Sequence, residues 1–397
     1  MGERTEERRA TGPVEIVSSR KELKASRQIW PLSKAYYTRA RQAKAAGKPV
    51  AWTLGLAPPE ILHALGVIPV MPEHYTSVLA VKQRLTPYLE WADAQGYPLH
   101  SCPYHRGTIG YVYSDEEQMI PPPDLILAMN FCDGGNKYIR PIVERFQVPY
   151  YYLDLPYLTG PADERGRGVP EEAIDYCAGQ LAEVVAFVER ATGTPRDPEQ
   201  FHQTFLWYNQ ALALWREINE LRKAVPCPMG VVDEVGDVYP LMQLAGTREA
   251  VAVYQMLLAE VKARVAAGEG ILDEERRRLI WLGVSPNYDT GILNYFERFG
   301  AVLVKSDLDY MYGEIDLEDP LRGMARKLIL DYRGEGVVCY APRGCRQTCG
   351  TISPIRDLVQ KELGLPLLAH EGNQADMLGY DGAQLRGAIE QFLERLG

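Results

Sequence analysis

Hydrophobic patterning divides the chain into two outer parts and one middle part. In the outer parts, before about residue 160 and after about residue 276, short apolar runs alternate with helical patterns. The middle part, residues 168–270, lacks strand-like runs and carries long amphipathic patterns. Because strands that alternate with helices form parallel sheets covered on both faces, we predict an α/β protein with two parallel-sheet lobes and a helical insert.

The same patterns predict the individual elements. The expected strands are "PVAWTLG", "VIPVMPE", residues 124–130 and residues 149–154 in the first lobe, and "RLIWLGV", "AVLVKSDL", "EGVVCYAP" and "LPLLAHE" in the second. The expected helical stretches are residues 28–47, 75–96 and 136–146, "PPEILHALG", "YDTGILNYFERFG", "SPIRDLVQKEL" and "GAQLRGAIEQFLERLG". In the insert, apolar residues recur every three or four positions and predict one helix face, formed by Phe205, Tyr208, Leu212, Trp215, Ile218 and Leu221.

Two segments of the chain share a pattern of strand, cysteine-bearing loop, helix and strand. Their helices and following turns, "IRPIVERFQVP" and "IRDLVQKELGLP", are nearly superposable, so we expect two related lobes of flavodoxin- or Rossmann-like type. Ligands of such sheets bind beyond the carboxyl ends of the strands, where Cys132 and Cys345 both fall. The repeat therefore predicts a cleft with one cysteine from each lobe. The expected boundaries are residues 1–47 for an N-terminal arm and helix, 48–160 for the first lobe, 161–275 for the helical segment and 276–397 for the second lobe.

Composition narrows the class of protein. The 397 residues are 46% apolar and 24% charged, which is ordinary for a globular protein. The net charge of −10 argues against a nucleic-acid partner, since phosphate binding needs a basic surface. The sequence has no apolar run of about 18 residues and begins with charged residues rather than a secretion signal. We therefore expect a cytoplasmic protein with no membrane partner.

Seven cysteines in a reducing compartment make a disulfide framework improbable and leave metal ligation or burial. Three of them are expected to serve packing, because they lie on a helical pattern, between two prolines and inside a strand: Cys177, Cys227 and Cys339. The others of interest stand in polar loops marked by Gly or Pro: Cys102, Cys132 and Cys345. Neighbouring glycines, Gly134 and Gly344, let a bulky inorganic group approach the backbone.

The residues alone leave three interpretations of these thiols open. The first is a 4Fe–4S cluster, which suits widely spaced single cysteines. The second is a zinc site, although structural zinc usually takes its ligands from close C-x2-C pairs, which the sequence lacks. The third is that the cysteines are unrelated and lie in these loops by coincidence. Cys349 is either a bystander at a helix start or a fourth ligand. His105 and His370 lie near the expected cleft, either in ordinary hydrogen bonds or in proton transfer. The chain carries no P-loop motif, no H-E-x-x-H and no G-x-S-x-G.

Three motifs carry a family resemblance. They are "CPYHRGTIG", "NFCDGGNKYIRP", and "PRGCRQTCG" followed by "LGLPLLAHEGNQADMLGYD". In this order they resemble the 2-hydroxyacyl-CoA dehydratase D-component family, which includes the benzoyl-CoA reductase iron–sulfur subunits. The resemblance covers roughly residues 30–397, and the last motif looks closer to the benzoyl-CoA reductase branch.

The resemblance implies a 4Fe–4S cluster in the cleft between the lobes. Carried over by position, its ligands are Cys102, Cys132 and Cys345. Cys349 departs from the family, which tends to have a small residue there; as a fourth ligand it would make this subunit an electron relay. The candidate proton donors are Tyr104, His105 and His370. Arg106 would orient the cluster or meet a CoA phosphate, or is an exposed surface residue.

The implied function is that of an iron–sulfur subunit of an ATP-dependent, low-potential acyl-CoA reductase resembling benzoyl-CoA reductase. A separate ATP-hydrolysing iron–sulfur activator would supply the electrons, which fits the missing P-loop. The implied partner is a homologous iron–sulfur subunit in a homo- or heterodimer. Two alternatives stay open: a 2-hydroxyacyl-CoA dehydratase subunit that eliminates water through a radical, and a non-catalytic metal-binding scaffold protein.

Overall fold

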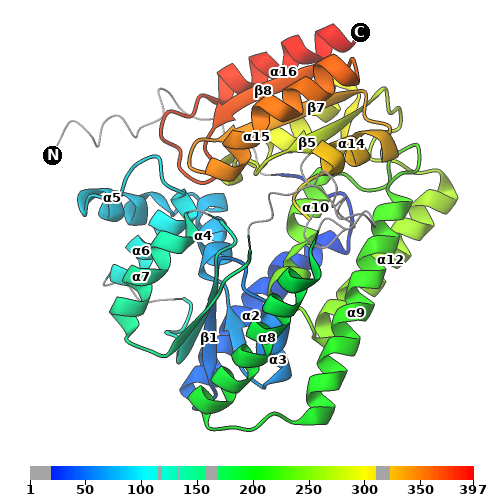
Figure 1. Cartoon of the computed structure of the whole chain (residues 1–397). Helices are drawn as coiled ribbons and strands as arrows, with labels where there is room; N and C mark the ends of the chain where they lie inside the picture. The colour runs from blue at the N-terminus through cyan, green and yellow to red at the C-terminus, as the bar shows by residue number, and fades with distance from the viewer. Residues whose placement is uncertain (1–18, 115–118, 133, 157–168, 310–321) are drawn as a thin grey trace.

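The chain folds into two α/β lobes joined by a group of long helices (Figure 1). The computed structural model describes residues 19–114, 119–132, 134–156, 169–309 and 322–397. Most of the predicted N-terminal arm, residues 1–18, lies outside this range. The predicted fold class is confirmed, while the four predicted boundaries remain predictions.

Each lobe is built on a four-stranded sheet in which every strand pair that the structure describes is parallel. The strands of the first sheet are β1 (Val50–Leu54), β2 (Ile68–Val70), β3 (Leu125–Met129) and β4 (Tyr150–Leu153). Those of the second are β5 (Arg277–Leu282), β6 (Ala301–Ser306), β7 (Gly336–Pro342) and β8 (Leu367–Gly372). Their orders, β2-β1-β3-β4 and β6-β5-β7-β8, are the same when each lobe is counted from its own first strand. The shared topology confirms that the lobes are related.

Helices cover the sheets and form the insert. The first lobe carries α2 (Ile29–Ala45), α3 (Pro59–Ala64), α4 (Pro72–Val81), α5 (Thr86–Ala94), α6 (Pro103–Tyr113) and α7 (Gly135–Phe146). The insert contains α8 (Glu171–Thr192), α9 (Pro198–Leu221), α10 (Val231–Asp237), α11 (Tyr239–Gln243) and α12 (Arg248–Ala267). The second lobe carries α13 (Ile292–Tyr295), α14 (Arg322–Asp331), α15 (Arg346–Arg356) and α16 (Gly382–Leu396). Shorter helical turns are η1 (Ser26–Gln28), η2 (Asn287–Asp289), η3 (Phe296–Phe299) and η5 (Asp357–Glu362).

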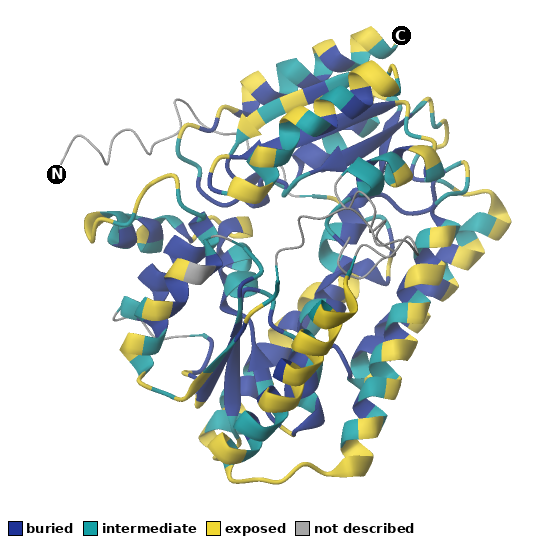
Figure 2. Ribbon diagram, in the orientation of Figure 1, coloured by how far each residue is buried: buried dark blue, intermediate teal, exposed yellow. Residues whose placement is uncertain are grey.

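The strands form the centre of both cores (Figure 2). Every residue of β1 and of β7 is buried, which explains why these segments are continuous apolar runs rather than alternating ones. In the insert, Trp215 of α9 lies 5.3 Å from Tyr254 of α12 between ring centroids. Among the described residues, no helix combines the length and the apolar character that crossing a membrane requires.

One predicted helix is wrong. The stretch "YDTGILNYFERFG" is divided into η2, α13 and η3. Tertiary contacts hold its start: Asn287 donates to Ser77 of the first lobe, and Asp289 accepts from the hydroxyl of Tyr380. Apolar periodicity cannot reveal such contacts, because they come from distant parts of the chain.

A buried ionic network ties the insert to the second lobe. Arg222 at the end of α9 donates to Glu234 of α10 and to the carbonyl oxygen of Val304 in β6, at 2.9 Å each. Lys305 pairs with the other oxygen of Glu234. The two cations lower the pKa of Glu234 to about 2 against the opposing effect of desolvation. The network therefore keeps these charges paired in the interior, where an unpaired charge would be costly.

Candidate functional site

Three cysteines line one pocket of about 290 Å³ where the two lobes meet. Cys102 directly precedes α6, Cys132 follows β3, and Cys345 stands between β7 and α15. The side chain of Gln347 crosses the boundary and donates to the carbonyl oxygen of Phe131 at 2.9 Å. The structure thus brings together residues from three distant loops, although their role as ligands stays a prediction.

Two glycines allow these loops to approach one another. A Cβ atom on Gly344 would stand 2.9 Å from both Pro103 and the carbonyl oxygen of Ser101. A Cβ atom on Gly134 would stand 2.9 Å from Nδ1 of His105. Both glycines line the pocket beside the cysteines, so a side chain at either position would push a cysteine-bearing loop away.

Polar groups surround the three sulfur atoms. The backbone N–H of Gly135 donates to Sγ of Cys132 at 3.3 Å, and the amide of Gln374 donates to Sγ of Cys102 at 3.5 Å. Burial raises the pKa of Cys102 to about 12 and that of Cys132 to about 11. Both thiols therefore hold their protons at neutral pH, and a bound metal would have to displace these protons.

The three thiols are of the ligand type that an iron–sulfur cluster takes. Among the described residues, no three His, Cys, Asp or Glu side chains are arranged to hold a metal ion. An iron–sulfur cluster is wider than a single ion and takes its thiolates from separate positions around it. Three thiols around an open pocket, with two glycines and hydrogen bonds to sulfur, fit a thiolate-held cluster.

Cys349 lies outside the set of residues that line the pocket. It is on α15, one turn after Cys345, and its Sγ donates to the carbonyl oxygen of Pro342 at 3.1 Å. The thiol of Cys349 is therefore engaged in a hydrogen bond at the end of β7. Nothing in this arrangement brings a fourth sulfur to the pocket.

Two of the predicted proton donors lie near Cys102. The hydroxyl of Tyr104 accepts from the amide of Asn287 at 2.8 Å, and burial raises the pKa of this tyrosine far above its usual value. The ring of His105 stacks on Tyr138 with 4.0 Å between ring centroids and an interplanar angle of 4°. Burial lowers the pKa of His105 to about 3, so its imidazole is neutral at ordinary pH. Both side chains are thus held in their neutral forms.

None of the predicted proton donors lines the pocket, and neither does Arg106. His370 is on β8 and stacks on Tyr340 at 5.9 Å. Arg106 is only 1% exposed and forms ion pairs with Asp93 and Asp376, so the interpretation as an exposed surface arginine is wrong. The guanidinium of Arg106 thus links α5, α6 and the segment after β8. It is directed at these two carboxylates and not at a phosphate site.

Glu73 is a candidate that the sequence did not reveal. It lies in the first turn of α4, just beyond the carboxyl end of β2. One carboxylate oxygen accepts from the N–H of Gly55 at 2.7 Å and from the hydroxyl of Tyr138. The other is buried and has no hydrogen-bond partner among the described residues. Desolvation raises the pKa of Glu73, and its charge in turn raises that of Cys132. The sequence signal that could have identified Glu73 is its position just beyond the end of a predicted strand, where ligands of parallel sheets bind.

Comparison with known proteins finds one matching family and several relatives. The model of the family described as 2-hydroxyglutaryl-CoA dehydratase, D-component, matches residues 56–396. The (R)-phenyllactyl-CoA dehydratase alpha subunit of Clostridium sporogenes is 25% identical, over 94% of this chain and 96% of its own. The lactoyl-CoA dehydratase alpha subunit of Anaerotignum propionicum is 22% identical, over 90% and 93%. A benzoyl-CoA reductase subunit of Thauera aromatica is 23% identical, over 76% and 78%. The family match spans both lobes and the insert.

Proposed function

The chain belongs to the 2-hydroxyglutaryl-CoA dehydratase D-component family, and from this premise we propose that it is a cluster-holding subunit that removes water from a 2-hydroxyacyl-CoA thioester. The observation that carries this proposal is the pocket lined by Cys102, Cys132 and Cys345, with Sγ of Cys349 bonded elsewhere. A metal group held by these three residues would have a coordination position left for substrate, as in catalytic metal sites. This subunit would then be a site of chemistry and not only an electron relay.

The residues that would hold a 4Fe–4S cluster are Cys102, Cys132 and Cys345. Such a cluster, when bound, supplies single electrons at low potential and a Lewis-acidic iron for a substrate oxygen. Gly134 and Gly344 leave room for it beside the backbone, and the N–H of Gly135 and the amide of Gln374 stabilise charge on two of the sulfur atoms.

Proton transfer is the task that remains for the side chains. Glu73 is suited to it, because Gly55 and Tyr138 fix one of its oxygens while the other stays free of partners among the described residues. Tyr138 also stacks on His105 and so connects this carboxyl group to the loop of Cys102. Tyr104 holds its proton and can donate a hydrogen bond. His370, on β8, is not among the residues that connect Glu73 to the loop of Cys102.

The proposed partners follow from the family. The relatives are named as subunits and so act with other chains, which supports a homologous subunit as partner here as well. The sequence has no P-loop motif, which supports a separate ATP-hydrolysing iron–sulfur activator as the electron source.

A second candidate function is the reduction of an aromatic acyl-CoA. The tail "EGNQADMLGYD" and the similarity to a benzoyl-CoA reductase subunit favour it. Product analysis distinguishes the two functions: the dehydratase forms an enoyl-CoA with loss of water, and the reductase forms a reduced ring without it. If the purified protein contains no cluster, both enzymatic functions are excluded and the non-catalytic scaffold function remains.

Anaerobic purification tests the proposal. The wild-type protein is expected to contain about four iron and four sulfide per chain. Cys345→Ser should lose most of both. Cys349→Ser, in the first turn of the helix that follows Cys345, should retain them and the activity measured with activator and ATP. A wild-type protein without iron, or an equal loss in the two variants, would contradict the proposed site.

A further inference from the structure

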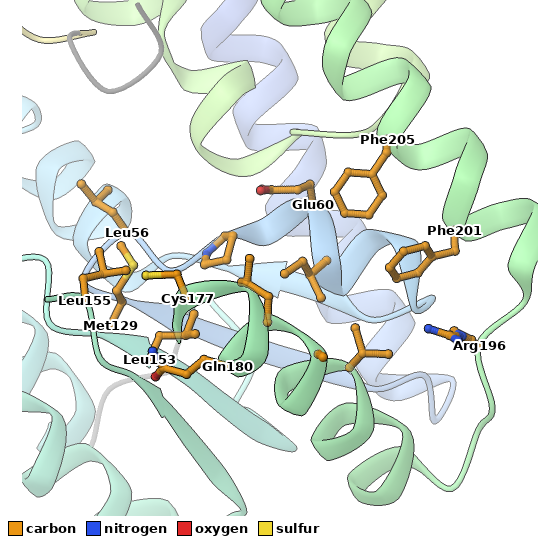
Figure 3. Close-up of a pocket in the computed structure, with 15 residues that line it drawn as sticks. Leu56, Glu60, Met129, Leu153, Leu155, Cys177, Gln180, Arg196, Phe201 and Phe205 are labelled. Carbon is orange, nitrogen blue, oxygen red and sulfur yellow. The ribbon is translucent and has the colours of Figure 1, made fainter. Parts of the chain in front are cut away.

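A second and larger pocket, of about 500 Å³, lies at the carboxyl end of the first sheet (Figure 3). It is enclosed by α3, by α8, by α9 and by the ends of β3 and β4. Most of its lining is aliphatic or aromatic: Ile61, Leu153, Leu181, Val185, Phe201 and Phe205. Its volume is typical of pockets that bind small molecules.

The inner end of this pocket lies at the carboxyl end of β3, the strand that Cys132 of the cysteine pocket follows. Leu56 and Met129, labelled together in Figure 3, line it at the ends of β1 and β3. Gly55 directly precedes Leu56 and donates to Glu73, and Cys132 follows Met129 by three residues. The backbones of β1 and β3 approach so closely here that a Cβ atom on Gly55 would collide with the carbonyl oxygen of Met129. Both pockets therefore lie beyond the carboxyl end of β3, and β1 ends beside it.

Leu56 adds an independent observation. Its φ angle is +63°, in the left-handed region that a leucine rarely adopts. The adjoining hydrogen bond from Gly55 to Glu73 helps to hold this backbone, and the side chain of Leu56 lines the pocket. Strained residues of this kind gather where proteins bind ligands.

The charges around the pocket limit what it can hold. Of the described residues that line it, only Glu60 and Arg196 belong to the acidic and basic types. Arg196 is at the end away from Leu56 in Figure 3, and its guanidinium lies 5.8 Å from the ring centre of Phe201. Desolvation raises the pKa of Glu60 to about 7. A carboxylate at the inner end would find no cation among these residues, and burying it unpaired is costly.

On the basis of the function proposed above, we infer that this pocket binds the acyl group of the substrate, and that this group is bulky, apolar and uncharged. An aromatic or branched aliphatic acyl group would fill the space between Leu56 and Phe205. A short acyl group would leave most of the apolar wall without contacts. An acyl group that ends in a carboxylate would bring a second acidic group close to Glu60, and the cation Arg196 lies at the opposite end of the pocket from Leu56.

Binding of three saturated CoA thioesters tests the inference, since without a 2-hydroxyl group they cannot lose water. The full-length protein, purified anaerobically, is titrated with 3-phenylpropanoyl-CoA, propanoyl-CoA and glutaryl-CoA by calorimetry. The first is expected to bind at least about tenfold more tightly than the other two, because its ring would be buried against the apolar wall.

Neighbouring positions on α8 provide matched variants. Cys177→Phe places a ring at a half-buried position of the pocket lining and Ala182→Phe at an exposed position of that lining, whereas Ala178→Phe adds the same ring at an exposed position outside the lining. The two wall variants should lose the preference for 3-phenylpropanoyl-CoA and keep propanoyl-CoA binding; the control should keep both. Circular dichroism confirms that each variant is folded, and the two wall positions provide separate tests.

The possible failures are distinguishable. Equal affinities for all three thioesters, a preference for glutaryl-CoA, or a preference that survives both wall variants would overturn the inference and leave the proposed function standing. Failure of every thioester to bind would overturn the inference and also acyl-CoA binding by this chain, while iron and sulfide content tests the cluster separately.

Discussion

The Cα atom of Cys102 lies 3.2 Å from the point that a Cβ atom on Gly344 would occupy. The loop after β7 in the second lobe thus rests directly on the residue that precedes α6 in the first. A contact tighter than ordinary van der Waals packing leaves no room for a methyl group, so the meeting of the lobes depends on the absence of a side chain at this position.

Replacement of Gly344 tests that relationship. Gly344→Ala should force the two loops apart, destabilise the protein by about 1–3 kcal/mol and reduce the iron content at least about twofold. Gly350→Ala is the matched control, because a Cβ atom there would meet nothing within 4 Å. Denaturant unfolding and iron analysis measure both effects, and equal behaviour of the two variants would show that the loops yield easily.

Glu73→Gln should impair catalysis without removing the cluster. The amide keeps the shape of the carboxyl group but cannot exchange a proton, so activity is expected to fall about 10²- to 10⁴-fold. Iron content should stay at the wild-type level. Glu144→Gln, at an exposed position on α7, serves as the control. Unchanged activity in Glu73→Gln would exclude this residue from proton transfer.

Arg106 should matter for stability. Arg106→Met leaves the carboxylates of Asp93 and Asp376 without their cation, and loss of one partner of a buried ion pair costs about 3–5 kcal/mol. Arg140→Met removes an exposed pair with Glu144 and should cost less than about 0.5 kcal/mol. Chemical denaturation of the two variants gives the comparison; similar midpoints would contradict the importance of the buried pair.

Glu60 predicts a pH dependence of stability. Its pKa is raised from 4.5 to about 7 by desolvation, so the folded state binds this proton more tightly than the unfolded state does. The free energy of unfolding should therefore fall as pH rises from about 4.5 to about 7. Glu60→Gln should remove up to about 3 kcal/mol of that fall, with the largest gain in stability above pH 7.

Urea unfolding at pH 4.5 and pH 8 measures this difference. Glu394→Gln, at an exposed position near the end of α16, should show the wild-type pH dependence. If Glu60→Gln and wild type respond alike to pH, the carboxyl group of Glu60 is solvated and does not limit what the adjoining pocket can bind.

Local sequence patterns were sufficient to identify the strands and to group them into two lobes. Buried parallel strands such as β1 and β7 are continuous apolar runs, and each is closed by glycine or proline, so the pattern along the chain identifies them. The internal repeat predicted related lobes, which the common strand order confirms. It also placed Cys132 and Cys345 at corresponding strand ends, since topology decides where a loop emerges.

The directions of the side chains between those strands follow only from the packing of the whole chain. Cys177, expected as a buried packing residue, is half-buried and lines the apolar pocket, and Arg106 is fully enclosed by two carboxylates from distant segments. Sγ of Cys349, one turn after Cys345, donates a hydrogen bond to the carbonyl oxygen of Pro342. Glu73 accepts a hydrogen bond from the hydroxyl of Tyr138. These relationships join residues far apart in the chain or depend on the rotation of a helix. Local sequence patterns specify neither the long-range contacts nor the rotation of a helix, because both are set by the packing of the whole molecule.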